Sequence, residues 1–372
     1  YSVISDFPRN IFFSILISVL SLLILISFYV FIAIKRVSFI FYRSRHQYWN
    51  NQITELLTIF LSKVDEGNVS DPVSKILPSF RSLPLHRGFI KDLLYHQIIT
   101  YQSNFTGNAA EKLKELFLRL RLHHLILKKI KSRRMEVKIR GIIDAAQLEL
   151  EQFSPQIKKL LHHRSSELRI EAQAAYIILN KAHGFDFLDE VKEPIQDWHQ
   201  LVLLDLIKRL NTNELPLFSN WLSSANRSVV DFCLKLINHF QQFEALPQIV
   251  QLLNHTDQEI KCLAIKILGE FEAQEYEQAL LVCYSEESTE LKAEILKALG
   301  RINSGNQLDF LKNESTSDAF EIAFEASAAL FAHGSKGIKV LKQSHHQVPA
   351  LNRQILDQLL STTITPSYGN LS

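Results

Sequence analysis

The sequence predicts an all-α protein, an α-solenoid of helical hairpins preceded by one transmembrane helix. The first observation behind this prediction is an uncharged apolar stretch over residues 11–34. The second is a set of apolar residues that recurs about every 31 positions from residue 134 onward. The third is the composition: 11 glycines and 10 prolines in 372 residues disfavour turn-dense β folds and enzymes built on glycine-rich phosphate loops.

The remaining composition narrows the class of protein further. With 47% apolar and 22% charged residues, the chain is neither wholly disordered nor collagen-like. Its three cysteines contain no CxxC pair, so they predict neither a disulfide framework nor a zinc knuckle and indicate a reducing compartment. Residues 1–140 hold 21 Lys and Arg against 9 Asp and Glu, whereas the rest of the chain is acidic. A basic half beside a membrane segment suggests contact with anionic lipid or an acidic partner.

Residues 11–34 are the predicted transmembrane helix, after a short non-cytoplasmic N-terminus over residues 1–10. These 24 residues contain no charge, proline or glycine. As a helix they reach about 36 Å, enough for a hydrocarbon core of about 30 Å. A buried core helix would show a polar stripe, and a cleaved signal peptide would have a shorter apolar stretch before a small-residue cleavage site. The sequence shows neither pattern.

The orientation of this span follows from the cations that flank it, because Lys and Arg resist translocation. Arg9 alone precedes the span. The cations that follow it closely are Lys35, Arg36, Arg43 and Arg45. We therefore expect a single-pass protein of the inner (plasma) membrane with its N-terminus outside and its C-terminal solenoid in the cytoplasm.

Residues 35–133 are a predicted juxtamembrane helical region. Apolar residues at helical spacing predict one amphipathic helix over residues 49–64. Three prolines in the following stretch, residues 65–87, predict a connector with at most one helical turn. Helical faces resume after it, with a break over residues 104–108.

Residues 134–345 are the predicted solenoid of about seven units, and residues 346–372 a C-terminal helix and flexible tail. One anchor position of the longer helix recurs every 30 or 31 residues, at Val137, Leu168, Trp198, Val229, Ile260, Leu291 and Ile322. The residues four and eight positions later are apolar or aromatic except Gly141. Each unit thus presents one apolar face that only its neighbours can bury. Trp198 and Trp221 are expected in this core.

The run HTDQEIKCLAIKILGEF, residues 255–271, resembles the second helix of a HEAT repeat. The residues at the family's characteristic offsets are Asp257, Ile260, Lys261, Ala264, Leu268 and Gly269, and in the next unit Leu291, Lys292, Ile295, Leu299 and Gly300. The resemblance implies that the capping Asp and a basic residue help to order successive turns. That basic position is filled by Lys138, Arg169, Lys261 and Lys292. The resemblance covers roughly residues 134–345, although only one unit keeps the Asp.

The strongest candidate binding site is the segment 119–140, with nine Lys or Arg against one acid. The residues expected to contact a protein partner or anionic lipid are Lys128, Lys129, Lys131, Arg133, Arg134, Lys138 and Arg140. Each cation that reaches an anionic bilayer contributes about 1 kcal/mol. A solvated helix end, where the backbone dipole favours cations, explains the pattern equally well. Nucleic acid would use the same charges, but no aromatic interleaving accompanies them.

The predicted function is that of a membrane-anchored scaffold or adaptor that binds a protein partner. GxSxG, P-loop, GxGxxG and HExxH motifs are all missing from the sequence, so we predict no enzyme, no catalytic residue, no cofactor and no metal site. The order of one span, a basic helical region and HEAT-like units is similar to single-span bacterial HEAT proteins associated with membrane glycosyltransferases of exopolysaccharide synthesis. That similarity implies such an enzyme as partner. The alternative is a HEAT-like nucleic-acid-binding protein or base-excision enzyme that uses residues 119–140 on phosphate.

Overall fold

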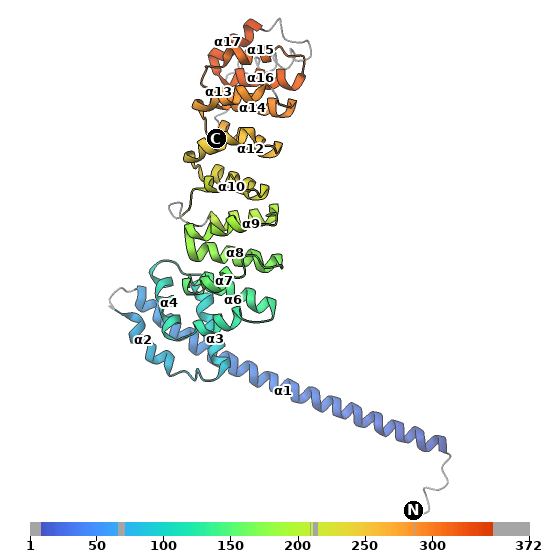
Figure 1. Ribbon diagram of the computed structural model, residues 1–372. Coiled ribbons are helices and arrows are strands. Elements are labelled where there is room, and N and C mark those ends of the chain that lie inside the picture. The colour runs from blue at the N-terminus through green and yellow to red at the C-terminus, as the bar shows by residue number, and fades with distance from the viewer. Residues whose placement is uncertain (1–8, 66–70, 209, 211–214, 286, 345–372) are drawn as a thin grey trace, which may run out of the picture. The chain divides into compact units, whose positions relative to one another are not determined.

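The protein is known from a computed structural model, which describes residues 9–65, 71–208, 210, 215–285 and 287–344 (Figure 1). The described residues form helices and no strand, which confirms the all-α prediction. The chain divides into two compact units, Tyr1–Phe153 and Ser154–Ser372, and each is described here by itself. The predicted tail over residues 346–372, and most of the predicted N-terminus over residues 1–10, lie outside the described residues.

The first unit begins with one continuous helix, α1 (Arg9–Asp65), drawn as the long blue helix in Figure 1. It contains both the predicted span and the predicted amphipathic helix over residues 49–64. Its C-terminal part buries Ile53, Leu57 and Phe60 completely, where α1 packs on the next three helices. Those helices are α2 (Pro72–Arg81), α3 (Gly88–Gln102) and α4 (Asn108–Arg119), and they are followed by α5 (His123–Ile130) and α6 (Met135–Gln147).

Helix α2 contradicts the prediction that residues 65–87 form a connector with at most one helical turn. It has ten residues, and its apolar face buries Ile76 and Phe80. Asp71 caps its N-terminus by accepting a hydrogen bond of 3.0 Å from the backbone N–H of Ser74. Pro72 stands in the first turn, where a missing N–H removes no helical hydrogen bond. Pro72, one of the three prolines behind the predicted connector, therefore starts a helix, and Pro78 lies inside it.

The second unit alternates long and short helices. The long helices are α8 (Ser166–Asn180), α9 (Asp197–Ile207), α10 (Arg227–Phe240), α12 (Gln258–Glu270), α14 (Thr289–Ile302) and α16 (Phe320–Ala332). The shorter ones are α7 (Ser154–Lys158), α11 (Leu246–Gln251), α13 (Glu277–Tyr284) and α15 (Leu308–Glu314), and the last helix is α17 (Gly334–Ser344). Helices α10, α12, α14 and α16 pack in succession, and α7, α11, α13 and α15 each pack on the long helix that follows. Neighbouring units thus bury one another, as expected of stacked repeats.

The predicted apolar stripe is buried in every long helix of the second unit except α9. In α12, for example, Ile260, Ala264 and Leu268 are all at most 1% exposed. In α9 the predicted anchor Trp198 is 49% exposed, so its expected place in the core is wrong, whereas Trp221 is buried as predicted. The buried positions of α9 include His199, which stands one residue after the anchor.

Two glycines set how closely the last long helices approach one another. A Cβ atom added to Gly269 on α12 would lie 2.8 Å from the Cα of Ala298 on α14. A Cβ atom added to Gly300 on α14 would lie 2.9 Å from the Cα of Ala329 on α16. Both distances are shorter than real Cβ contacts. The Leu-Gly pair of the repeat therefore places a glycine where the next helix touches the backbone.

Candidate binding surfaces

The basic segment, residues 119–140, begins at the last residue of α4 and includes α5, the turns on either side of it and the first half of α6. The exposed cations of the predicted site are Lys128, Lys131, Arg133, Arg134 and Arg140, while Lys138 is half-buried. Lys128 belongs to the last turn of α5, where the helix dipole stabilises cations. Arg133 and Arg134 instead precede the first turn of α6, where the dipole disfavours them. The dipole alone therefore does not account for the whole cluster.

The structure places Lys129 apart from these exposed residues. Its Nζ atom lies 2.9 Å from Oδ2 of Asp144, a residue of α6 that is only 4% exposed. The same Nζ lies 4.0 Å from the ring centroid of Tyr95, whose hydroxyl donates to the same carboxylate. Burial, followed by the charge of Asp144, raises the pKa of Tyr95, so the hydroxyl keeps the proton that it donates. Lys129 is thus engaged inside the first unit.

The sequence offered one signal for this buried cluster. Asp144 stands among Gly141, Ile142 and Ala145 on the buried face of α6. A carboxylate on an apolar face requires a buried partner. The partners Tyr95 and Lys129 lie on other helices, so the spacing of residues does not identify them.

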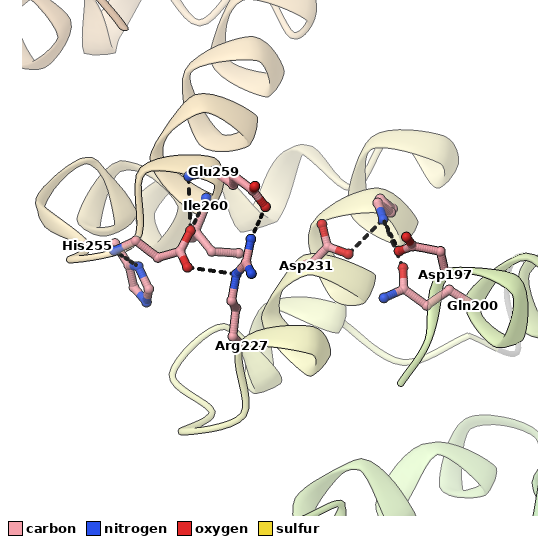
Figure 2. Close-up of polar contacts among 9 residues, drawn as sticks. Asp197, Gln200, Arg227, Asp231, His255, Glu259 and Ile260 are labelled. Carbon is pink, nitrogen blue, oxygen red and sulfur yellow. Dashed lines mark hydrogen bonds and ion pairs between the residues drawn. The ribbon is translucent and has the colours of Figure 1, made fainter. Parts of the chain in front are cut away.

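Ion pairs connect successive long helices of the second unit (Figure 2). Arg227 of α10 pairs with Asp257 at 2.7 Å and also with Glu259. Asp257 caps α12 by accepting from the backbone N–H groups of Glu259 and Ile260, which confirms its predicted capping role. The same carboxylate therefore caps the N-terminus of α12 and pairs with Arg227 of the neighbouring helix α10.

A second group in the same figure lies between α9 and α10 (Figure 2). The Nζ atom of Lys235 donates to Oδ2 of Asp231 at 2.7 Å and to Oε1 of Gln200 at 2.9 Å. It also lies 3.9 Å from Asp197. Because Lys235 and Asp197 are exposed, their ion pair contributes little stability by itself.

The basic position implied by the family resemblance also makes contacts within the second unit. Lys261 of α12 pairs with Glu287 at 2.5 Å, and Arg169 of α8 donates to the backbone oxygen of His163 at 2.9 Å. The Nζ atom of Lys292 lies 5.3 Å from the ring centroid of Tyr284. These three basic residues therefore support the turns between helices.

Residues 246–330 match the family model of HEAT repeats. This match confirms the resemblance for the part of the second unit from α11 to most of α16. No curated protein matches the chain.

Solved structures of other helical proteins resemble the chain only distantly. An engineered protein is 14% identical, with 86% of this chain and 95% of that chain covered and a TM-score of 0.35. Kap121p is 14% identical, with 80% of this chain and 35% of that chain covered and a TM-score of 0.30. The complex of CpcE and CpcF of phycocyanin lyase from Nostoc sp. PCC7120 is 13% identical, with 73% and 89% covered and a TM-score of 0.22.

Proposed function

We propose that this protein is a single-pass membrane protein that holds a helical-repeat scaffold at the cytoplasmic face of the inner membrane and binds a protein partner there. The observation that carries the proposal is the division of α1 into two parts. Every residue from Phe13 to Tyr42 is exposed, and most are large and apolar. From Ile53 onward the same helix buries one face, which includes Ile53, Leu57 and Phe60, against the rest of the first unit. A bilayer would cover the exposed part, which is long and apolar enough to cross it.

An aromatic contact lies where α1 enters the folded part of the first unit. The ring of Phe89, in the first turn of α3, lies 5.7 Å from that of Tyr42 and 5.4 Å from that of His46. The guanidinium of Arg45 lies 5.8 Å from the same ring. Aromatic and cationic side chains at this position suit the headgroup level of a bilayer. They support an anchor that ends near Tyr42 and is joined directly to α3.

The solenoid and the basic segment together supply the binding surface in this proposal. Stacked repeats offer an extended surface, and anchoring raises its local concentration near other membrane proteins. The candidate partner is a membrane glycosyltransferase of exopolysaccharide synthesis, on the similarity of domain order alone. In this role the scaffold itself needs no catalytic group.

We expect that replacing Leu22 and Leu25 with arginine will release the protein from the membrane. Each arginine near the middle of a span costs about 2.5 to 3.5 kcal/mol on insertion. The measurement is the share of protein that stays in the membrane pellet after alkaline carbonate washing, with an N-terminal tag to show that the segment is not cleaved. The matched control carries arginine at the exposed positions Gln52 and Glu55 of the same helix and should stay in the pellet. Release of the wild-type protein, or equal retention of the Leu22→Arg/Leu25→Arg variant, would contradict the anchor.

We expect that changing Lys128, Lys131, Arg133 and Arg134 to glutamate will remove proteins that co-purify with the full chain in mild detergent. Lys129 is left unchanged because its charge is needed inside the first unit. The control reverses four exposed cations of the second unit, Lys208, Lys266, Lys336 and Lys339, and so alters the net charge equally. If both variants retain the same partners as the wild-type protein, the basic segment is not their docking site. Loss of steeply salt-dependent nucleic-acid binding would instead favour the alternative function.

A further inference from the structure

The second unit contains a pocket of about 690 Å³. It is lined by Arg169 and Gln173 of α8, by His199 of α9, and by the non-helical strap that precedes α9, residues 191–196. Its volume lies in the range of small-molecule and side-chain binding sites, about 300–1,000 Å³. Neither the repeat match, which begins at residue 246, nor the basic segment includes it.

The strap is held in place by the N-terminus of α10. The Nδ2 atom of Asn226 donates to the backbone oxygens of Val191 at 3.0 Å and of Glu193 at 3.2 Å. The backbone N–H of Ile195 donates to Oγ of Ser228 at 2.8 Å. These bonds fix the wall of the pocket, so the side chains that line it are pre-organised.

Gln173, which lines the pocket, has a buried acceptor without a partner. The residue is 2% exposed, and its Nε2 atom donates to the backbone oxygen of Leu161 at 3.0 Å. This bond fixes the orientation of the amide, because the opposite orientation would bring two acceptor oxygens together. Its Oε1 atom is buried and has no hydrogen-bond partner among the described residues. A buried acceptor without a donor costs free energy, so it marks a position where a ligand can donate.

His199, which lines the same pocket, has a second buried atom without a partner. The residue is 5% exposed, and its Nε2 atom has no partner among the described residues. Burial, with a smaller contribution from the charge of Arg169, lowers the pKa of His199 to about 4. The ring is therefore neutral near pH 7, and Nε2 accepts a hydrogen bond when the proton is on Nδ1.

The charged groups around the pocket disfavour a strongly charged ligand. The cations Arg169 and Lys192 face the carboxylates of Asp189, Glu190 and Glu193. Four of these groups have partners of their own. Asp189 accepts from Nε1 of Trp221 at 2.7 Å, Arg169 lies 3.3 Å from Glu193, and Glu190 lies 3.4 Å from Nε2 of His162, which also lines the pocket. A phosphate would be repelled by the three carboxylates, which outnumber the two cations, and an ammonium would be repelled by Arg169.

We propose that this pocket binds a primary carboxamide group. Such a group brings one N–H donor for each of the two buried acceptors, Oε1 of Gln173 and Nε2 of His199, and an oxygen that can accept from the guanidinium of Arg169. A hydroxyl or a secondary amide brings one donor only, and a carboxylate brings none. The group can come from the side chain of Asn or Gln in a partner protein or from a small free amide. This site stands apart from the membrane anchor, so its failure would leave the proposed function untouched.

The experiment is a titration of the full chain in detergent micelles, with histidine labelled with ¹⁵N and observed by NMR. The probes are butanamide and its matched analogues N-methylbutanamide, butanoate and butan-1-ol. The Nε2 resonance of His199, identified by its loss in His199→Gln, should shift with butanamide. The analogues should bind at least tenfold more weakly, because each leaves a buried acceptor unpaired.

Substitutions test the two acceptors separately. Gln173→Met should weaken butanamide binding at least tenfold, and His199→Phe should weaken it similarly when followed by ligand-observed NMR. The matched control is Gln147→Met in the first unit, because Gln147 also donates its Nε2 to a backbone oxygen, that of Ile99, at 2.8 Å. This control should bind butanamide as the wild type does. The comparison of the four probes on the wild-type chain stands even if a variant fails to fold.

A second arm identifies the source of the carboxamide. A capped hexapeptide with a central Gln is compared with the same peptide carrying Glu. Because both peptides have the same backbone amides, a difference in affinity reports on the side chain alone. Preference for the Gln peptide with at least tenfold tighter binding than butanamide assigns the site to a partner protein, and equal or weaker binding assigns it to a small amide. Equal binding of all four small probes, or no binding of butanamide, would overturn the proposal.

Discussion

Replacing Leu268 with aspartate is expected to unfold the middle of the second unit. Leu268 is fully buried in α12, where α12 packs on α14. The substitution removes a large apolar side chain and buries a carboxyl group without a partner, which together cost at least about 4 kcal/mol. Because each unit is stabilised by its neighbours, the loss should spread to α10 and α14.

Hydrogen–deuterium exchange of the full chain measures this effect helix by helix. In the Leu268→Asp variant, amides of α12 and α14 should exchange much faster than in the wild-type protein. Lys266→Asp is the matched control, since Lys266 is exposed on the same helix and should leave the exchange nearly unchanged. Normal protection of α12 and α14 in the Leu268→Asp variant would contradict the stacked arrangement.

Removing the carboxylate of Asp144 should have the second largest effect, in the first unit. Asp144→Leu leaves the ammonium of Lys129 and the hydroxyl of Tyr95 without their shared partner. Breaking one side of a buried ion pair costs about 3 to 5 kcal/mol, whereas replacing the whole group with apolar residues is often neutral. The triple variant Asp144→Leu/Lys129→Met/Tyr95→Phe should therefore recover most of the loss.

Thermal unfolding of the single and triple variants separates the effect of unpaired polar groups from the effect of altered packing. The Asp144→Leu variant should show fast hydrogen exchange in α3, α5 and α6, while protection in the second unit stays as in the wild-type protein. Recovery in the triple variant indicates that the loss arises from unpaired polar groups rather than from altered packing. A triple variant as unstable as the single one would contradict this account of Lys129.

The apolar stripe of the repeats could be predicted because its physical cause is local and periodic. Val229, Ile260, Leu291 and Ile322 are each at most 4% exposed, as the 31-residue interval predicts. The amphipathic part of α1 could be predicted for the same reason. In both cases burial follows from the spacing of apolar residues along one helix.

The register of α9 could not be predicted, because its buried face contains polar residues. His199 and Gln200 are buried there, whereas the neighbouring Trp198 and Leu201 are exposed. A search for apolar periodicity selects Trp198, which stands one position too early. One of these buried polar residues, His199, also lines the pocket of the second unit. Departures of this kind from the local pattern are expected where a fold carries a binding site.

The position of Lys129 could not be predicted either, since its partners come from different helices. A run of cations in the sequence does not show which side chains turn inward. The carboxylate of Asp144 and the ring of Tyr95 select Lys129 from among its neighbours. Tertiary contacts of this kind have no signature in charge or spacing.

The contacts of Gly269 and Gly300 have a consequence for how the chain can gain or lose a whole repeat in evolution. Gly269 and Gly300 are 31 residues apart, and so are the alanines that they touch, Ala298 and Ala329. Deletion of residues 270–300 would put Gly269 in the sequence position of Gly300, opposite Ala329. The α12–α14 and α14–α16 contacts are therefore equivalent. Duplication or loss of one whole 31-residue repeat in the gene would again place a glycine opposite an alanine at the new helix–helix contact.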